Sequence, residues 1–203
     1  MTYDPKIHHR RSVRLKEYDY SQSGGYFITI CTHNRKFLFG EIVNEEMILN
    51  EYGNIVSQCW LEIPNHFPNV EIGEFIVMPN HIHGIVIIYN DYDYGVNEVN
   101  GVNEVNEVRT QHAVSLQHHT ELKQTFGKLI PSSISTIIRS FKSAVTKQFN
   151  KNNGKSGEPV WQSGFYEHII RDEKDSNNIT DYIINNVLKW SEDLYFKKMI
   201  KNY

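Results

Sequence analysis

"VEIGEFIVMPNHIHGIVIIY", residues 70–89, contains two runs of β-branched and other apolar residues that are separated by Pro79 and Asn80. Such runs on either side of a turn dipeptide predict two strands, at 70–78 and 81–89, joined by a short turn. The second run is apolar on both faces, which is typical of a strand in the centre of a sheet. This segment therefore predicts the middle of an antiparallel sheet.

The residues before this pair predict a further hairpin and a helix. "GGYFITICTH" (24–33) is rich in aromatic and β-branched residues and predicts a first strand, and "KFLFGEIV" (36–43) is expected to return as its hairpin partner. From Asn50 to Ile63 apolar residues recur at steps of three and four, which predicts an amphipathic helix. Its apolar positions are Ile55, Val56, Cys59, Trp60 and Ile63.

The chain changes character after residue 89. "GVNEVN" occurs at 95–100 and again at 101–106. Two short polar copies cannot build a stacked core, so we expect 90–130 to be a flexible insertion within one domain that spans 1–203.

A second amphipathic helix follows in "SSISTIIRSFKSAVTKQFN", where Ser132 or Ser133 is expected to provide the N-terminal cap. Its apolar stripe is Ile134, Ile137, Ile138, Phe141, Val145 and Phe149.

"PVWQSGFYEHIIRD" (159–172) contains a last strand, and Asp172 or Asp175 is expected to begin a final helix that runs to about Trp190. The predicted buried face of this helix is Ile179, Ile183, Val187 and Trp190. Strands and helices in this order predict an α+β fold, with a ferredoxin-like, mainly antiparallel sheet and helices packed on it.

The composition predicts a globular protein of ordinary type. Of the 203 residues, 39% are hydrophobic and 22% are charged. No apolar run is long enough to span a bilayer, and the N-terminus lacks the apolar centre of a signal peptide, so we expect a cytoplasmic location and no membrane partner. Cys31 and Cys59 lack the spacing of a zinc site.

The charge distribution is compatible with a nucleic-acid partner. The net charge is −3, but residues 91–108 contain five acids and no Lys or Arg, so the remainder carries +2. Clusters of basic residues are an electrostatic footprint of DNA binding, although an ordinary surface scatter gives the same pattern. The clusters are Arg10, Arg11, Arg14 and Lys16; Arg35 and Lys36; and Arg139, Lys142 and Lys147.

Two pairs of polar residues have spacings that suit a metal site. His81 and His83 are two residues apart on a predicted strand, so both side chains leave the same face and could converge on one ion. Tyr182 and Asn186 are four apart on the final helix and are therefore neighbours on its surface. An Asn186 amide oxygen would complete a mixed site of the kind that accepts Mg²⁺ or Mn²⁺. The alternative is that the histidine spacing is accidental and that Tyr182 only packs.

Four segments resemble one known family. "VMPNHIHGIVII" resembles the His-hydrophobic-His strand of HUH endonucleases, and "VWQSGFYEHIIRDEKDSNNITDYIINNVLKW" is similar to the C-terminal motif of REP-associated tyrosine transposases, which are relatives of the single-strand transposases of small insertion sequences. "HRRSVRLKEYDYSQSGGYFITICTHNRKFLFGEI" and "IIRSFKSAVTKQFN" are similar to the N-terminus and middle helix of that family. The resemblance covers nearly all of the chain except 90–108.

The resemblance implies an HUH endonuclease fold and a role for each candidate residue. His81 and His83 would be metal ligands, Asn186 would stand where the family places a third polar ligand, and Tyr182 would be the nucleophile. The implied reaction cleaves and rejoins single-stranded DNA near hairpins through a covalent phosphotyrosine. The family usually has Asn-Pro at this point, whereas Val187 follows Asn186 here, so we expect a longer helix and an altered position of Asn186.

The implied partner is single-stranded or hairpin DNA. Arg10, Arg11, Arg14 and Lys16, with Arg139 and Lys142, are candidates for phosphate contacts, while Arg35 and Lys36 either face the DNA or lie at an exposed hairpin end.

The sequence leaves other questions open. The family includes homodimers that exchange the tyrosine helix as well as monomers. Two alternative functions also remain, a hairpin-DNA-binding protein without catalysis and a metal-dependent hydrolase of small phosphate esters.

Overall fold

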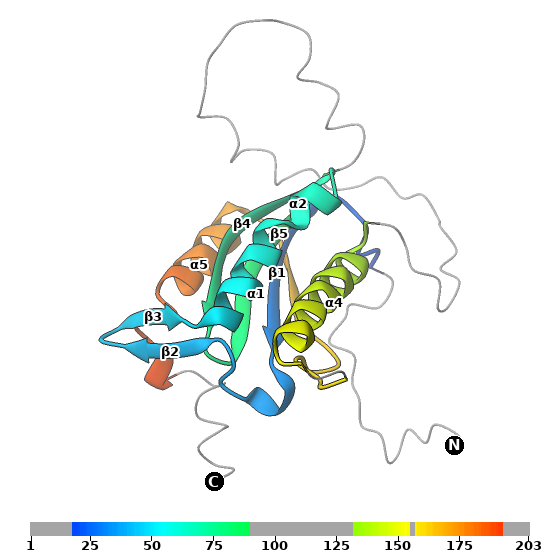
Figure 1. Ribbon diagram of the computed structural model, residues 1–203. Helices are drawn as coiled ribbons and strands as arrows, with labels where there is room; N and C mark the ends of the chain where they lie inside the picture. The colour runs from blue at the N-terminus through cyan, green and yellow to red at the C-terminus, as the bar shows by residue number, and fades with distance from the viewer. Residues whose placement is uncertain (1–17, 90–131, 155–156, 193–203) are drawn as a thin grey trace, which may run out of the picture.

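The computed structural model describes residues 18–89, 132–154 and 157–192 (Figure 1). Within them a four-stranded antiparallel sheet has the order β4-β5-β1-β6 and carries helices on both faces. This confirms the predicted α+β fold. The strands are β1 (Gly24–Cys31), β2 (Gly40–Val43), β3 (Glu46–Leu49), β4 (Val70–Met78), β5 (His81–Ile88) and β6 (Tyr166–Ile170). The helices are α1 (Glu51–Leu61), α2 (Ile63–His66), α4 (Ile134–Asn152) and α5 (Glu173–Ile184), with short 3₁₀ turns η1 (His33–Arg35) and η2 (Trp190–Glu192).

Strand β5 lies inside the sheet between β4 and β1, as its apolar composition predicted. Its register places His83 opposite Thr29 of β1 and opposite Ile76 of β4. On the far side of β1, Thr29 is in turn paired with Tyr166 of β6. Side chains alternate along each strand, so these four residues form one row across the same face of the sheet, which we call the site face.

The opposite face, the core face, is covered by α1 and α4 (Figure 1). The predicted stripe of α4 is buried at all six positions, and Ser133 caps the helix by accepting a hydrogen bond from the Thr136 amide. Trp60 of α1 packs against Phe141 and over Gly84. A Cβ atom at Gly84 would collide with the Trp60 ring, so glycine is what lets this indole lie directly behind the histidine strand.

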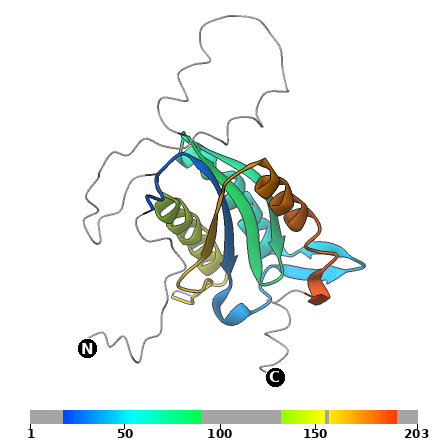
Figure 2. The same ribbon diagram turned by 180° about the vertical axis from the view of Figure 1, so that it is seen from behind.

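Helix α5 packs on the site face, on the opposite side of the sheet from α1 and α4 (Figure 2). Ile183 of α5 joins a small apolar cluster with Phe27, Ile85 and Ile170. Figure 2 shows the helix lying toward the β4 and β5 side of the sheet rather than over β6. Through Ile183 the helix also reaches β1 and β6, while Tyr166 at the start of β6 stays exposed.

The prediction that 36–43 pairs with the first strand is wrong. The partners of β1 are β5 and β6, while β2 pairs with β3 in a separate two-stranded ribbon. Asn34 and Arg35 of η1 have φ values of 53° and 56°, and this left-handed turn directs the chain away from β1.

Two helix boundaries also differ from the expectations. The predicted helix from Asn50 to about Ile63 is α1, which ends at Leu61 and is followed by the separate short helix α2, and the last helix ends at Ile184 rather than near Trp190. The absence of a proline after Asn186 therefore does not lengthen α5. The expected insertion at 90–130 lies outside the described residues, and no helix in the described part is long and apolar enough to cross a membrane.

Candidate metal and tyrosine site

His81 and His83 lie side by side on the site face of β5. Their ring centroids are 4.5 Å apart, and the two residues are 0% and 1% exposed. Both imidazoles are thus held within the sheet rather than on a mobile loop. The structure brings these two predicted residues together.

Each imidazole has a hydrogen-bond partner at Nδ1. The Asn80 side-chain oxygen lies 2.7 Å from Nδ1 of His81, and the Thr29 hydroxyl lies 2.8 Å from Nδ1 of His83. Because an amide oxygen only accepts, Nδ1 of His81 carries the hydrogen and its Nε2 keeps the lone pair. This arrangement is typical of metal-binding histidines, whose second nitrogen is oriented by a neighbouring acceptor.

Thr29 and Asn80 were not among the residues singled out from the sequence. Asn80 directly precedes His81 in the turn, so its proximity had a local signal. Thr29 is 54 positions from His83 and is brought to it only by the pairing of β1 with β5.

Burial keeps both imidazoles neutral. Desolvation lowers the pKa of His83 from 6.5 to about 3. Desolvation also lowers the pKa of His81 well below its usual value, and the nearby His83 and Arg35 lower it further. Neutral imidazoles offer a free lone pair near pH 7, which a metal ion requires.

Tyr182 of α5 meets the histidine pair from the solvent side. Its phenol oxygen lies 3.2 Å from Nε2 of His83, and the two rings are 5.1 Å apart. The Tyr182 ring also lies edge-on to Phe27 at 6.0 Å, and the residue is 41% exposed. The phenol is therefore placed between a buried imidazole and solvent, within reach of a large substrate.

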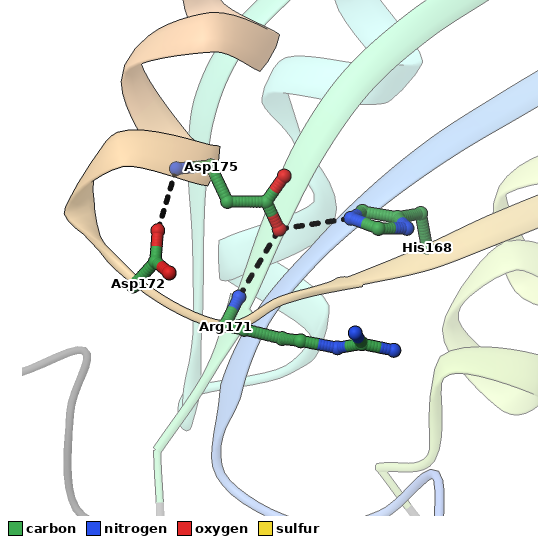
Figure 3. A network of polar contacts seen from close by, with 4 residues as sticks. All are labelled: His168, Arg171, Asp172 and Asp175. Atoms are coloured by element: carbon green, nitrogen blue, oxygen red, sulfur yellow. Dashed lines mark hydrogen bonds and ion pairs between the residues drawn. The ribbon is translucent and has the colours of Figure 1, made fainter.

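A polar network at the start of α5 fixes the position of this helix (Figure 3). Asp172 caps α5 by accepting a hydrogen bond from the Asp175 amide at 2.7 Å. The Asp175 carboxylate accepts from Nε2 of His168 at 2.8 Å and from the Arg171 amide at 3.2 Å. Because His168 belongs to β6, these bonds tie the tyrosine helix to the edge strand of the sheet.

Asn186 lies just beyond the end of α5 and is 2% exposed. It stands four residues after Tyr182 and four before Trp190, whose ring stacks on His81 at 6.0 Å. Its side-chain oxygen is buried and accepts no hydrogen bond from the described residues. An oxygen of this kind is available to a cation.

His81 and His83 alone supply two ligands for a divalent ion, and within the part of the chain that the structure describes a third ligand would have to be the side-chain amide oxygen of Asn186. Among the described residues there is no group of three His, Cys, Asp or Glu side chains that could hold a metal ion. Two neutral imidazoles and the Asn186 oxygen are the remaining candidates, and mixed nitrogen and oxygen ligation suits Mn²⁺, and Mg²⁺ less well.

The predicted DNA-binding residues are distributed over different parts of the molecule. Arg35 is close enough to His81 for its charge to lower the pKa of that imidazole, and Lys36 is exposed beside it. Arg139 and Lys142 lie instead on α4, which covers the core face; the Lys142 ammonium donates to the carbonyls of Gln162 and Gly164. The remaining four, Arg10, Arg11, Arg14 and Lys16, lie outside the described residues.

Comparisons with known proteins give two sequence relatives and one similar solved structure of note. No family model matches the chain. An uncharacterized protein of Haemophilus influenzae is 44% identical over 191 residues, which are 94% of this chain and 95% of the relative. Another protein of that organism, provisionally named as a REP-associated tyrosine transposase, is 27% identical over 173 residues, 84% of this chain and 74% of the relative. A solved REP-associated tyrosine transposase bound to a REP hairpin has a similar fold, with a TM-score of 0.51 and 20% identity over 88% of this chain and 74% of that one.

The depressed pKa values of the two histidines predict a loss of stability in acid. The unfolded chain takes up these protons near pH 6.5, whereas folded His83 does so only near pH 3. The unfolded state therefore binds more protons in this window, and the free energy of unfolding should fall by about 1 kcal/mol per pH unit for each buried imidazole.

Urea unfolding between pH 7 and 5, in buffer with a chelator, measures this slope. His83→Gln should flatten it, while His66→Gln, at an exposed position on α2, should leave the wild-type slope. Equal slopes in all three proteins would contradict the assignment of the acid sensitivity to the buried pair.

The network at the start of α5 predicts that Asp175→Ala destabilises the protein by about 1–2 kcal/mol. The change removes two hydrogen bonds and a negative charge from the N-terminal end of the helix. Asp181→Ala is the matched control, because it removes an exposed carboxylate from the last turn, where a negative charge is unfavourable. Chemical unfolding of both variants provides the measurement, and an equal loss in the two would contradict the anchoring role of Asp175.

Proposed function

We propose that this chain, as a member of the REP-associated tyrosine transposase family, cleaves and rejoins single-stranded DNA beside hairpins through a covalent bond to Tyr182. The observation that carries the proposal is the 3.2 Å approach of the Tyr182 phenol to Nε2 of His83, beside a second neutral imidazole. A nucleophile within hydrogen-bond distance of one potential metal ligand, with a second ligand beside it, is the arrangement expected for metal-assisted phosphoryl transfer.

His81 and His83, together with the Asn186 oxygen, would hold the divalent ion. When bound, Mg²⁺ or Mn²⁺ would polarise the scissile phosphate and offset the negative charge that develops on its oxygens. The Tyr182 phenol lies at hydrogen-bond distance from Nε2 of His83, and a nitrogen that held the ion would not at the same time bond to the phenol.

The reaction is an exchange of one phosphate ester for another. The Tyr182 oxygen forms a bond to phosphorus and loses its proton, while the bond to the departing 3′-oxygen breaks and that oxygen leaves as a hydroxyl. Attack by the 3′-hydroxyl of a second strand reverses the step and releases the tyrosine. Since the number of ester bonds is unchanged, no nucleoside triphosphate is needed.

The proposed substrate is a DNA hairpin with an adjacent unpaired strand. The solved relative is bound to a REP hairpin, and the charge of Arg35 beside His81 supports a phosphate contact close to the site. We propose Arg35 and Lys36 as the contacts nearest the reacting phosphate. Further phosphate contacts are proposed for Arg10, Arg11, Arg14, Lys16, Arg139 and Lys142.

The proposal predicts that Tyr182→Phe abolishes the covalent adduct and leaves DNA binding unchanged within about two-fold, because the variant lacks only the attacking oxygen. The assay incubates a labelled single strand that carries a hairpin with protein and Mn²⁺ and then separates denaturant-resistant adducts on a gel. Tyr89→Phe is the control; its phenol donates to Glu71 at the far end of β5, and its adduct should form as in the wild type.

An adduct formed by Tyr182→Phe would show that the nucleophile is another residue. Hairpin binding by the wild type without any adduct would instead support a DNA-binding protein that lacks catalysis.

The hydrogen bond between Asn80 and His81 predicts that Asn80→Ala weakens Mn²⁺ binding by roughly 10- to 100-fold, because the Nδ1 hydrogen loses the acceptor that orients the ring. The signal of free Mn²⁺ in electron paramagnetic resonance measures this affinity without DNA or turnover. Asn65→Ala, at an exposed position on α2, should bind Mn²⁺ as the wild type does. Unchanged affinity in Asn80→Ala would exclude His81 as a ligand oriented in this way.

A further inference from the structure

Exposed aromatic side chains are concentrated at one place on the described surface. Across residues 18–89, 132–154 and 157–192, the three most exposed aromatic residues are Tyr166, Phe37 and Tyr182, at 44%, 42% and 41%. All three are linked to the histidine pair by ring contacts. Large exposed apolar groups that gather at one site mark a binding surface more often than a random scatter does.

Tyr166 flanks the pair on the β6 side. It lies in the same row of the site face as Thr29 and His83, two strands away from the latter, which is a separation of about 10 Å. Phe27 bridges the gap, with its ring 6.4 Å from Tyr166 and stacked at 5.4 Å on His83. The Tyr166 side chain is 44% exposed, so its ring is accessible to a ligand.

Phe37 flanks the pair on the other side. Its ring lies 5.7 Å from Trp190, and Trp190 is stacked at 6.0 Å on His81. Two cationic residues, Arg35 and Lys36, directly precede Phe37, and the Arg35 charge acts on His81. An exposed ring next to cations suits a nucleotide, which offers an aromatic base and a phosphate together.

We propose that Tyr166 and Phe37 are stacking platforms for two unpaired nucleobases, one on each side of the phosphate that lies over His81 and His83. The inference rests on the proposed function and names the groups that would hold its single-stranded substrate. Base pairs in a duplex stack on one another and hide their faces, so the platforms select unpaired strands. Because every base has a π-face, they position the strand without determining its sequence.

Binding measured in a Tyr182→Phe background tests the inference without any cleavage. The probe is a fluorescein-labelled oligothymidylate of about 20 nucleotides, long enough to cover the site, and the readout is fluorescence anisotropy. Tyr166→Ala and Phe37→Ala should each weaken binding roughly 5- to 100-fold. Tyr166→Phe and Phe37→Tyr keep an aromatic ring and should bind the oligothymidylate with the affinity of the parent protein. Tyr166→Leu should bind as weakly as Tyr166→Ala, although leucine is a large apolar residue.

Leu188→Ala provides the matched control. Leu188 is a large exposed apolar residue near the end of α5 with no aromatic contact to the histidines, and its removal should leave the affinity unchanged. Photocrosslinking of an oligothymidylate that contains 5-iododeoxyuridine should yield adducts at Tyr166 and Phe37.

Affinities of the Tyr166 and Phe37 alanine variants equal to that of Leu188→Ala would overturn the proposal, and so would a parent protein that does not bind the oligothymidylate. Failure of the proposed function is a separate result, because a protein that forms no adduct can still bind through these rings. Conversely, if a protein that lacks both rings but retains Tyr182 still forms the adduct, the stacking role of Tyr166 and Phe37 is excluded and the assignment of Tyr182 as the nucleophile is retained.

Discussion

Alternation along β5 sends His81 and His83 to one face of the sheet and Ile82, Gly84 and Val86 to the other. The two sets cannot be separated, because a slip of one residue would press both imidazoles against Trp60 and expose the isoleucine and valine. The apolar core behind β5 therefore fixes the register that the site needs. Thr29, Ile76 and Tyr166 are aligned with His83 by the same ladder of hydrogen bonds.

Burial of the imidazoles has a chemical consequence as well as a cost. Removing them from water lowers their pKa values and keeps their lone pairs available at neutral pH. The acceptor beside Nδ1 of His81 compensates for part of the desolvation and selects the tautomer whose Nε2 points outward. The phenol comes from a different element, so the site combines a rigid pair of ligands with a separately mounted nucleophile.

The sequence predicted local features well and long-range ones poorly. Strands β4 and β5 were predicted from apolar, β-branched runs on either side of a turn dipeptide, and the buried stripe of α4 from its steps of three to four residues; both are local signals. The predicted pairing of segment 36–43 with β1 was wrong. The strands that pair with β1 are decided by the left-handed turn at Asn34 and by β6, which is more than 120 residues away. Strand β3 was missed because its turn uses Asn44 and Glu45 with positive φ, without the glycine that normally marks such a turn. The contacts of Thr29 with His83 and of Trp190 with His81 depend on the same distant pairings.

The helix that carries the tyrosine is attached to the sheet at both ends. Asp175 bonds to β6 at its start, Ile183 packs near its close, and turns replace regular helix from Asn185 onward. Tyr182 stands seven residues beyond Asp175, or about 10 Å along the axis. A rotation of roughly 10° about the aspartate would displace the phenol by about 2 Å. Because Ile183 is buried in the apolar cluster beside Tyr182, its packing resists such a rotation and holds the phenol next to the His83 nitrogen.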